Sequence, residues 1–339
     1  MAVSDALALP PLIRTQDALR AGRSRRVLSE AAARGRLVRL RNGVYCDAEE
    51  WRSLEGRERH LLRCRAVLET RSSPVVLCNW SAAAVWGVPI LGEWPAEVHV
   101  MAAPAAGGRS KNGIRRHPAA TAVGVAEHRG FHVTVLSRTI LDVVMASPFA
   151  PAVGSLDWAL WRRNPWRVSR DDVRSELLRL NPRYGRRHAE AVLDFGTGLS
   201  DSFGESLNRA VMFELGYPVP ELQVRFKDRS GEIVVDYFWR DLRIAGEFDG
   251  DAKYLRPAFD SHLSPAQLVL REKKREDRLR RLVDGVVRIT MQETRNPALL
   301  DALLRDAGLT PGPPPRRDRL SLQAPGYQGR AMHKWGRRA

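Results

Sequence analysis

Glycines and an Asn-Gly pair divide residues 10–47 into short segments of different hydrophobic period, which restricts what this part of the chain can form. Helical patterns end at Gly22 and at Gly35, and the alternating segment RLVRL follows at once. Helices commonly end before a glycine, because glycine adopts a left-handed conformation at little cost. Asn42-Gly43 is a strong type I′ turn signal between two strands. The predicted order of helix, tight turn, helix and ribbon is a winged helix-turn-helix over residues 1–50.

The arginine content predicts a nucleic-acid partner. The chain has 55 Lys and Arg against 39 Asp and Glu, a formal net charge of +16. Guanidinium groups match phosphate oxygens, so DNA or RNA is favoured, and an anionic membrane is a weaker candidate because no amphipathic anchor is found. A basic composition without such a partner is the alternative. Around the second helix and the ribbon we expect DNA contacts from Arg23, Arg25, Arg26, Arg36, Arg39 and Arg41.

The next two segments differ in their patterns. Residues 51–150 alternate between strand-like runs such as EVHVMAAP and HVTVL and helical runs such as SRTILDVVMA, which predicts an α+β domain. Residues 151–200 change to helical periodicity with many arginines. We predict a basic helical connector there, either solvated or facing DNA.

Membrane and disulfide-based folds are disfavoured. No stretch approaches the roughly 18 continuous apolar residues of a membrane span, and the N-terminus lacks the pattern of a secretory signal. The three cysteines, Cys46, Cys64 and Cys78, suit neither a disulfide framework nor a zinc pair. We expect a cytoplasmic protein with no membrane partner, and its oligomeric state is not predicted.

The last third has the pattern of an α/β domain over residues 201–308. FGESLNRAVMFELG predicts an amphipathic helix, three strand-like runs follow it, and a charged helix over about 265–283 precedes the apolar strand GVVRIT and a short helix. Residues 309–339 have little apolar content and predict a disordered basic tail. The expected fold class is therefore multidomain α/β.

Three carboxylates fall on one face of the hairpin predicted for VVDYFWRDLRIAGEFDG. With the turn centred on positions 240 and 241, Asp236 lies opposite Ala245, and the period of two puts Asp236, Glu247 and Asp249 together. Like charges this close raise one another's pKa unless a cation compensates them. Oxygen ligands of this kind favour Mg²⁺ or Mn²⁺ over zinc.

Two further residues complete the parts that metal-assisted phosphodiester cleavage needs. Glu205 lies on the preceding helix, and Lys253 follows Asp249 by four residues, within reach of a bound phosphate. Such catalysis uses carboxylates to hold the ion, the ion to activate water, and a lysine to orient water or stabilise the phosphorane. The alternative is that Asp236 and Glu247 face solvent on an edge hairpin.

Residues 200–305, with this spacing of acids, Gln223 and the helix REKKREDRLR, resemble the PD-(D/E)XK restriction-endonuclease-like superfamily, in particular very-short-patch repair endonucleases. The resemblance implies that Asp236 and Glu247 bind the metal and that Glu205 is the helix acid. Asp249 stands where that superfamily has its lysine. Either Lys253 substitutes for that lysine, or the domain binds metal or DNA without cutting.

Residues 10–145 resemble a second family, the AbiEi-type antitoxins of type IV toxin–antitoxin systems. GRSRRVLSEAAARGRLVRLRNGVY carries the resemblance in the winged helix, and NWSAAAVWGVP and VTVLSRTILDVV carry it in the middle domain. It implies DNA binding of an autoregulatory kind, with a nucleotidyltransferase-like toxin as the cognate partner.

Two functions follow as hypotheses. The first is a Mg²⁺-dependent DNA endonuclease guided by its winged helix, with Glu205, Asp236, Glu247, Asp249 and Lys253 as catalytic candidates. The second is a non-enzymatic transcriptional regulator or antitoxin whose nuclease-like domain is a binding platform. An RNA-processing or adaptor protein is a weaker third, since winged helices also bind proteins.

Overall fold

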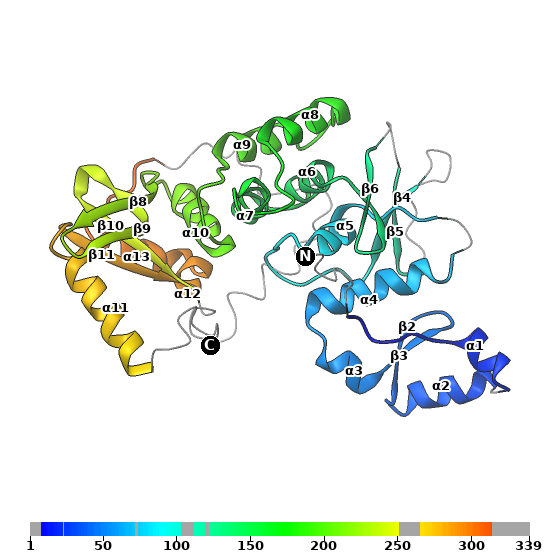
Figure 1. The fold of residues 1–339 in the computed structure, drawn as a ribbon. Helices are drawn as coiled ribbons and strands as arrows, with labels where there is room; N and C mark the ends of the chain where they lie inside the picture. The colour runs from blue at the N-terminus through cyan, green and yellow to red at the C-terminus, as the bar shows by residue number, and fades with distance from the viewer. Residues whose placement is uncertain are drawn as a thin grey trace. The chain divides into compact units, whose positions relative to one another are not determined.

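The computed structural model describes residues 8–22, 24–71, 74–102, 112–118, 123–250 and 265–313. The described chain divides into two units, each with its own helices and small sheets (Figure 1), which confirms the predicted multidomain α/β class. Unit 1 takes in the chain up to Ala146 together with Val168–Arg183, and unit 2 takes in Ser147–Arg167 and the chain from Tyr184.

The N-terminal part of unit 1 has the predicted order of two helices and a β-ribbon. Leu28 is buried and fixes the second helix to the ribbon side, while the neighbouring residues of that helix are exposed or half-buried. A short first strand completes a three-stranded sheet in the order β1-β3-β2. The elements are β1 (Ile13–Arg14), α1 (Thr15–Arg20), α2 (Arg25–Ala33), β2 (Leu37–Arg41) and β3 (Val44–Asp47).

The tip of the ribbon differs from the type I′ turn that the sequence predicts. Gly43 has a φ of +78°, but Asn42 does not have the positive φ that a type I′ turn also requires. The pairing of β2 with β3 shifts by one residue between Arg39 and Arg41. A bulge increases the local twist of the strands, which a type I′ turn would otherwise have to match. The connection therefore needs a positive φ at Gly43 and does not need one at Asn42.

The middle of unit 1 mixes short sheets with helices, as an α+β domain does. β4 pairs in parallel with β5, β6 pairs antiparallel with β7, and Leu77 bridges Val100 and Val133. Leu77 contributes an isolated bridge and no longer strand, because the chain enters α5 at Asn79. The elements are α3 (Ala48–Ser53), α4 (Gly56–Leu68), α5 (Asn79–Trp86), β4 (Val98–Ala102), β5 (Ile114–Pro118), β6 (Val125–His128), β7 (Phe131–Thr134), α6 (Leu136–Ala146) and α8 (Arg170–Leu180).

The predicted connector over residues 151–200 is not a separate segment. α7 (Phe149–Leu160) and α9 (Arg186–Phe195) belong to unit 2, whereas α8 belongs to unit 1. α7 is largely apolar and buried, and its Asp157 pairs with Arg209 of α10 (Phe203–Glu214) at 3.0 Å. Burial of α7, which the arginines around it obscure in the sequence, explains the difference.

Unit 2 is built on a four-stranded sheet in the order β11-β10-β9-β8, with β10 and β11 parallel and the other pairs antiparallel. Leu309 is buried in its core, so the folded part runs into the segment predicted as a tail, whose residues 314–339 lie outside the described chain. The elements are β8 (Glu221–Asp228), β9 (Gly231–Trp239), η2 (Arg240–Leu242), β10 (Ile244–Asp249), α11 (Pro265–Leu279), β11 (Gly285–Thr290), α12 (Met291–Arg295) and α13 (Pro297–Asp306).

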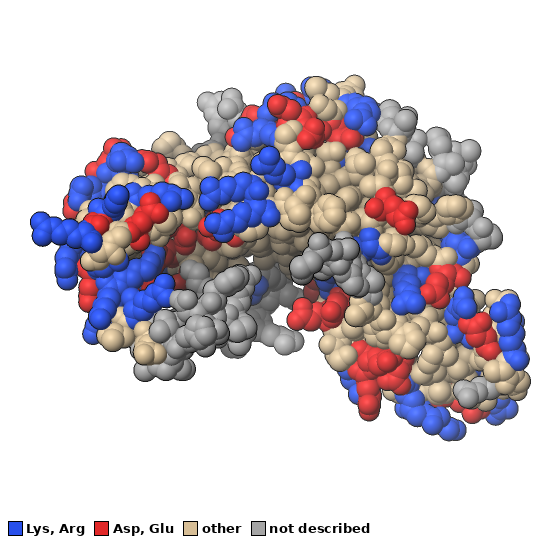
Figure 2. Space-filling view, in the orientation of Figure 1, with Lys and Arg blue, Asp and Glu red and all other residues tan. Residues whose placement is uncertain are grey.

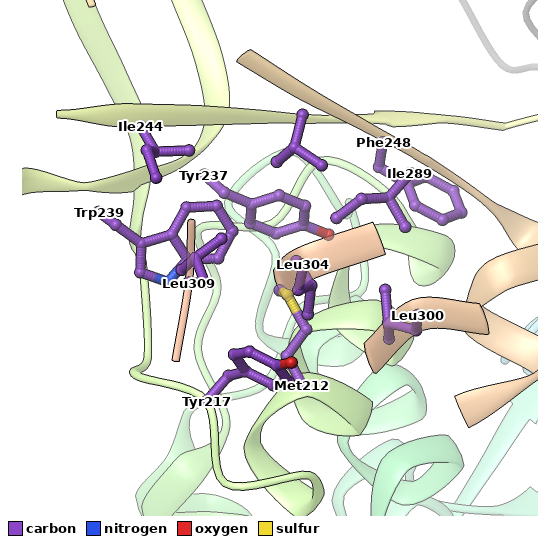
Figure 3. Close-up of a cluster of buried hydrophobic side chains, with 11 residues drawn as sticks. Met212, Tyr217, Tyr237, Trp239, Ile244, Phe248, Ile289, Leu300, Leu304 and Leu309 are labelled. Atoms are coloured by element: carbon purple, nitrogen blue, oxygen red, sulfur yellow. The ribbon is translucent and has the colours of Figure 1, made fainter. Parts of the chain in front are cut away.

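Both faces of this sheet are covered. Ile244 and Ala245 are adjacent in β10 and therefore point to opposite faces. Ile244 packs in the cluster that includes Met212 of α10 and Leu300 of α13 (Figure 3), and Ala245 packs in the cluster that includes Leu279 of α11. The sheet thus has an α10/α13 face and an α11 face, and its charged side chains must be accommodated between helix and sheet.

A chain of buried neutral side chains joins α4, α5 and β4 in unit 1. His60 Nδ1 donates to the carbonyl oxygen of Pro95 at 2.8 Å, so its Nε2, 2.9 Å from Ser81 Oγ, accepts the hydroxyl proton. Ser81 Oγ in turn accepts from the backbone N–H of His99 at 2.8 Å. Burial lowers the pKa of His60 to about 4, and burial with the charge of His117 lowers that of His99 to about 2.

Acidification below about pH 6.5, the pKa of unfolded histidine, should therefore destabilise unit 1. Unfolded histidine has a pKa of 6.5, against about 4 for folded His60, so the unfolded state binds more protons as pH falls below 6.5. The folded state loses up to about 1.4 kcal/mol per pH unit for each such histidine. Urea unfolding from about pH 7.5 to about pH 5 measures this loss.

The matched variant is His60→Gln, whose amide can keep both hydrogen bonds without titrating. We expect its stability to fall less steeply with pH than that of the wild type. Identical slopes for the two proteins would contradict the assignment of a neutral His60.

Candidate nucleic-acid interface and acidic cluster

The second helix of the N-terminal motif presents arginines to solvent. Arg25 opens α2, is exposed, and makes no ion pair with any described residue. Arg26 is also exposed, but its Nε donates to Glu30 at 2.6 Å one turn further along the helix. Figure 2 shows Lys and Arg side chains, with some Asp and Glu among them, over the part of unit 1 that holds α1 and α2. Arg25 is thus the arginine of α2 most available to a ligand.

The ribbon arginines differ in their availability. Arg36 is exposed beside the ribbon, and exposed Arg39 donates to Asn42 Oδ1 at 2.9 Å, which holds its side chain along the wing. The Nε and Nη1 atoms of Arg41 are buried without a hydrogen-bond partner, and burial together with the charge of Arg71 lowers its pKa. Arg41 is therefore less accessible than the sequence suggests, and Arg23 lies outside the described residues.

In the hairpin that carries the acidic cluster, the pairing register of β9 with β10 differs by two residues from the predicted one. Ala245 pairs with Phe238 instead of Asp236, and the pairing of β10 with β9 runs from Ile244–Trp239 to Gly246–Tyr237. A shift of two keeps every side chain on its face, so Glu247 and Asp249 still share one face of β10.

Asp236 lies at a point where β9 changes the face it presents. Val235 packs in the α11-side cluster and Tyr237 in the α10/α13-side cluster, although two residues apart they should share a face. Opposite them in β8, Gln223 has a φ of +53°. Both strands therefore twist at this point, and the simple period of two used for the sequence does not hold at Asp236.

Gln223 joins Asp236 to Glu205. Its Nε2 donates to Asp236 Oδ1 at 3.2 Å and lies 3.3 Å from Glu205 Oε2, while the backbone N–H of Phe248 donates to Asp236 Oδ2 at 2.9 Å. Gly204 allows this approach, because a side chain there would overlap the ring of Phe248. Burial, together with the charge of Asp236, raises the pKa of Glu205 to about 7.

The other two carboxylates are bound by arginines. Both oxygens of Glu247, which is 5% exposed, accept from Arg275 of α11, at 2.6 and 3.1 Å. Arg288 of β11 donates to Asp249 Oδ2 at 3.0 Å and lies 3.7 Å from Glu247. The predicted three-carboxylate patch is thus divided between a Glu205–Asp236 pair and an arginine-bound Glu247–Asp249 pair.

These residues do not fit a divalent cation as they stand. The Arg275 guanidinium, bound to both oxygens of Glu247, repels a second cation there, and the described residues contain no group of three or more His, Cys, Asp or Glu side chains that could hold a metal. Lys253 lies outside the described residues. The roles predicted for Asp236 and Glu247 as metal ligands stay predictions.

Arg275 and Arg288 are the site residues that the sequence reasoning missed. Arg275 lies in the charged helical segment REKKREDRLR. Arg288 interrupts the otherwise apolar strand GVVRIT, and a charged residue in a buried strand needs a partner of opposite charge. The strand pairing puts Arg288 beside Glu247. That isolated charge in GVVRIT was the available signal.

Two helices, a tight connection and a β-wing with exposed arginines define a winged helix-turn-helix of the kind that transcriptional regulators use. Residues 6–46 match the family model described as "Transcriptional regulator, AbiEi antitoxin". The N-terminus therefore carries an AbiEi-antitoxin-family domain, which confirms that part of the predicted resemblance. The match covers much less than half of the chain and characterises this domain alone.

Relatives that cover most of the chain carry no functional name. The chain is 29% identical over 284 residues to two Mycobacterium tuberculosis proteins, spanning 80% of this chain and 92% of each relative. They are "Uncharacterized protein MT2308" of strain CDC 1551 / Oshkosh and "Uncharacterized protein Rv2248" of strain ATCC 25618 / H37Rv. The resemblance of residues 200–305 to restriction endonucleases stays a prediction.

One solved structure shares a weak likeness with the chain. It is described as "Crystal structure of RV2827C protein from Mycobacterium tuberculosis", with 16% identity and a TM-score of 0.36 over 58% of this chain and 75% of that one. A likeness at this level carries no conclusion about fold or function. Separately, none of the described helices is long and apolar enough to cross a membrane.

Replacing Arg275 with Ala should destabilise unit 2 by about 3 kcal/mol, because it leaves the buried Glu247 carboxylate without its bidentate partner. The control is Arg280→Ala, which breaks a solvent-exposed pair with Glu276 at the end of α11 and should cost less than about 1 kcal/mol. Urea unfolding followed by circular dichroism compares the two variants.

A second substitution isolates the cause. Adding Glu247→Gln to Arg275→Ala removes the unpaired charge and should recover part of the lost stability. Equal destabilisation by Arg275→Ala and Arg280→Ala would contradict a special role for the Glu247 pair.

Proposed function

We propose that this protein is a DNA-binding transcriptional regulator that recognises its site through the N-terminal winged helix-turn-helix. The observation that carries the proposal is the coincidence of two findings on one segment. Residues 6–46 match a family of transcriptional regulators, and the structure of the same segment presents exposed arginines on α2 and on the wing.

In this proposal α2 enters the major groove, and its N-terminal residues contact base edges. Arg25 has the suited position and chemistry, because a guanidinium without an internal ion pair can bind the O6 and N7 atoms of guanine. Arg26 can reach phosphate only in exchange for Glu30. Arg36 and Arg39 would contact the backbone from the wing side, where exposed guanidinium groups match phosphate oxygens.

The finer parts of the proposal follow from the family description. An antitoxin that represses its own promoter, with a nucleotidyltransferase-like toxin as the cognate partner, is consistent with the words "Transcriptional regulator, AbiEi antitoxin". A cytoplasmic location belongs to the same proposal. Magnesium-dependent cleavage is not part of this proposal, because Glu247 is bound by Arg275. Cleavage stays a prediction from the sequence.

The test is binding of the full chain to a labelled duplex of its own promoter, in EDTA and at moderate salt. We expect binding without divalent metal, and a loss of about tenfold or more in affinity for Arg25→Ala, as for a lost bidentate base contact. A random duplex of the same length reports the non-specific part and should be less affected.

Arg52→Ala is the matched control, since Arg52 is an exposed arginine of α3 outside the helix-turn-helix. It should leave the promoter affinity nearly unchanged. A wild-type protein that binds its promoter no better than the random duplex would sink the proposal.

A further inference from the structure

The carboxylates of β10 form ion pairs with two arginines, Arg275 and Arg288. Arg275 binds Glu247 through both guanidinium nitrogens, and its Nη2 also donates to the carbonyl oxygen of Val234 at 2.8 Å. It thereby joins α11 to β10 and β9 at once. The geometry is the fork-to-fork arrangement that makes arginine a better partner than lysine for a buried carboxylate.

Arg288 closes the set from the other side. Besides Asp249, its guanidinium donates to Glu272 at 3.0 Å and to Glu276 at 3.2 Å, two acids one turn apart on α11. Burial acts to lower the pKa of Arg288, but the hydrogen bonds that it donates to Glu272 and Asp249 raise it overall. The pKa of Arg275 is raised in the same way, against burial, by its hydrogen bond to Glu247, so both guanidinium groups are charged at neutral pH.

Two guanidinium groups thus lie where a divalent ion would have to bind. An ion bound between Glu247 and Asp249 needs carboxylate oxygens at about 2.0–2.6 Å, where it would meet the positive charges of Arg275 and Arg288, which lie 2.6 and 3.0 Å from those oxygens. The two positive charges lie beside the Glu247 and Asp249 carboxylates, and they are shared with Glu272 and Glu276 of α11. The positive charge that Glu247 and Asp249 require is therefore provided by the protein itself.

We infer that Arg275 and Arg288 take the place of a divalent cation in this chain, so that unit 2 folds and works as a metal-independent domain. The inference concerns unit 2 and does not depend on the DNA-binding role of α2. In this arrangement the carboxylates of β10 bind arginines of α11 and β11. They then hold no metal ion of the kind that phosphodiester cleavage would need.

The first experiment measures the melting temperature of the full-length protein in EDTA, Mg²⁺ and Mn²⁺ at equal ionic strength. We expect no saturable shift for the wild type. The same samples incubated with supercoiled plasmid should show no metal-dependent nicking. A saturable rise in melting temperature, or nicking, that disappears in Glu247→Gln would overturn the inference.

The second experiment uses Arg275→Gln/Arg288→Gln, which leaves the carboxylates in place and removes both positive charges. We expect a lower melting temperature that Mn²⁺ raises again, and no Mn²⁺ response once Glu247→Gln is added. Arg280→Gln, which removes the exposed partner of Glu276 on the same stretch of chain, is the control and should show neither effect.

Each outcome of these two experiments either supports or contradicts the inference. A double variant that folds and shows no Mn²⁺ response would contradict the replacement of a cation by the two arginines. If the double variant does not fold, the melting temperatures and plasmid nicking of the wild type and Glu247→Gln still test the inference. Promoter binding by α2, measured separately, should be the same in EDTA and Mn²⁺ for the wild type.

Discussion

A carboxylate that a strand carries into a protein interior needs a positive charge beside it, and this requirement organises unit 2. Glu247 is 5% exposed on the second strand of the sheet, and Arg275 reaches it from α11 with two hydrogen bonds. The same solution joins α7 to α10, where Arg209 meets Asp157 at 3.0 Å and both side chains are almost fully buried. Such pairs add little net stability, but each one strongly disfavours any other position of the helix that carries it.

In unit 1 one group of buried polar side chains is satisfied without charge. His60, Ser81 and His99 form a neutral hydrogen-bonded chain between α4, α5 and β4, in which every donor has a defined acceptor. The helix-turn-helix beside it has little interior of its own, because Leu28 is the one fully buried residue of α2. A helix held by one side chain leaves the rest of its surface for a ligand, as a recognition helix requires.

Local signals predicted the order of elements better than their partners. Gly22, Gly35 and Gly43 marked real helix ends and a real turn, since a positive φ is a property of the residue itself. The face shared by Glu247 and Asp249 was also predicted correctly although the turn was misplaced, because a shift of two residues preserves parity. The reversal at Asp236 was not predictable, because it depends on the left-handed conformation of Gln223 in the neighbouring strand.

The same limit explains why the acidic cluster suggested a metal. Arg275 lies 28 residues from Glu247 in the chain, and nothing near Glu247 in the sequence indicates which cation will meet it in the fold. A net charge of +16 likewise does not say which arginines are available to a ligand. Arg275 and Arg209 are committed to internal carboxylates and Arg41 is half-buried, whereas Arg25 and Arg36 are exposed. Nucleic-acid binding depends on the exposed class, because a guanidinium that already holds a buried carboxylate must break that pair before it can bind a phosphate.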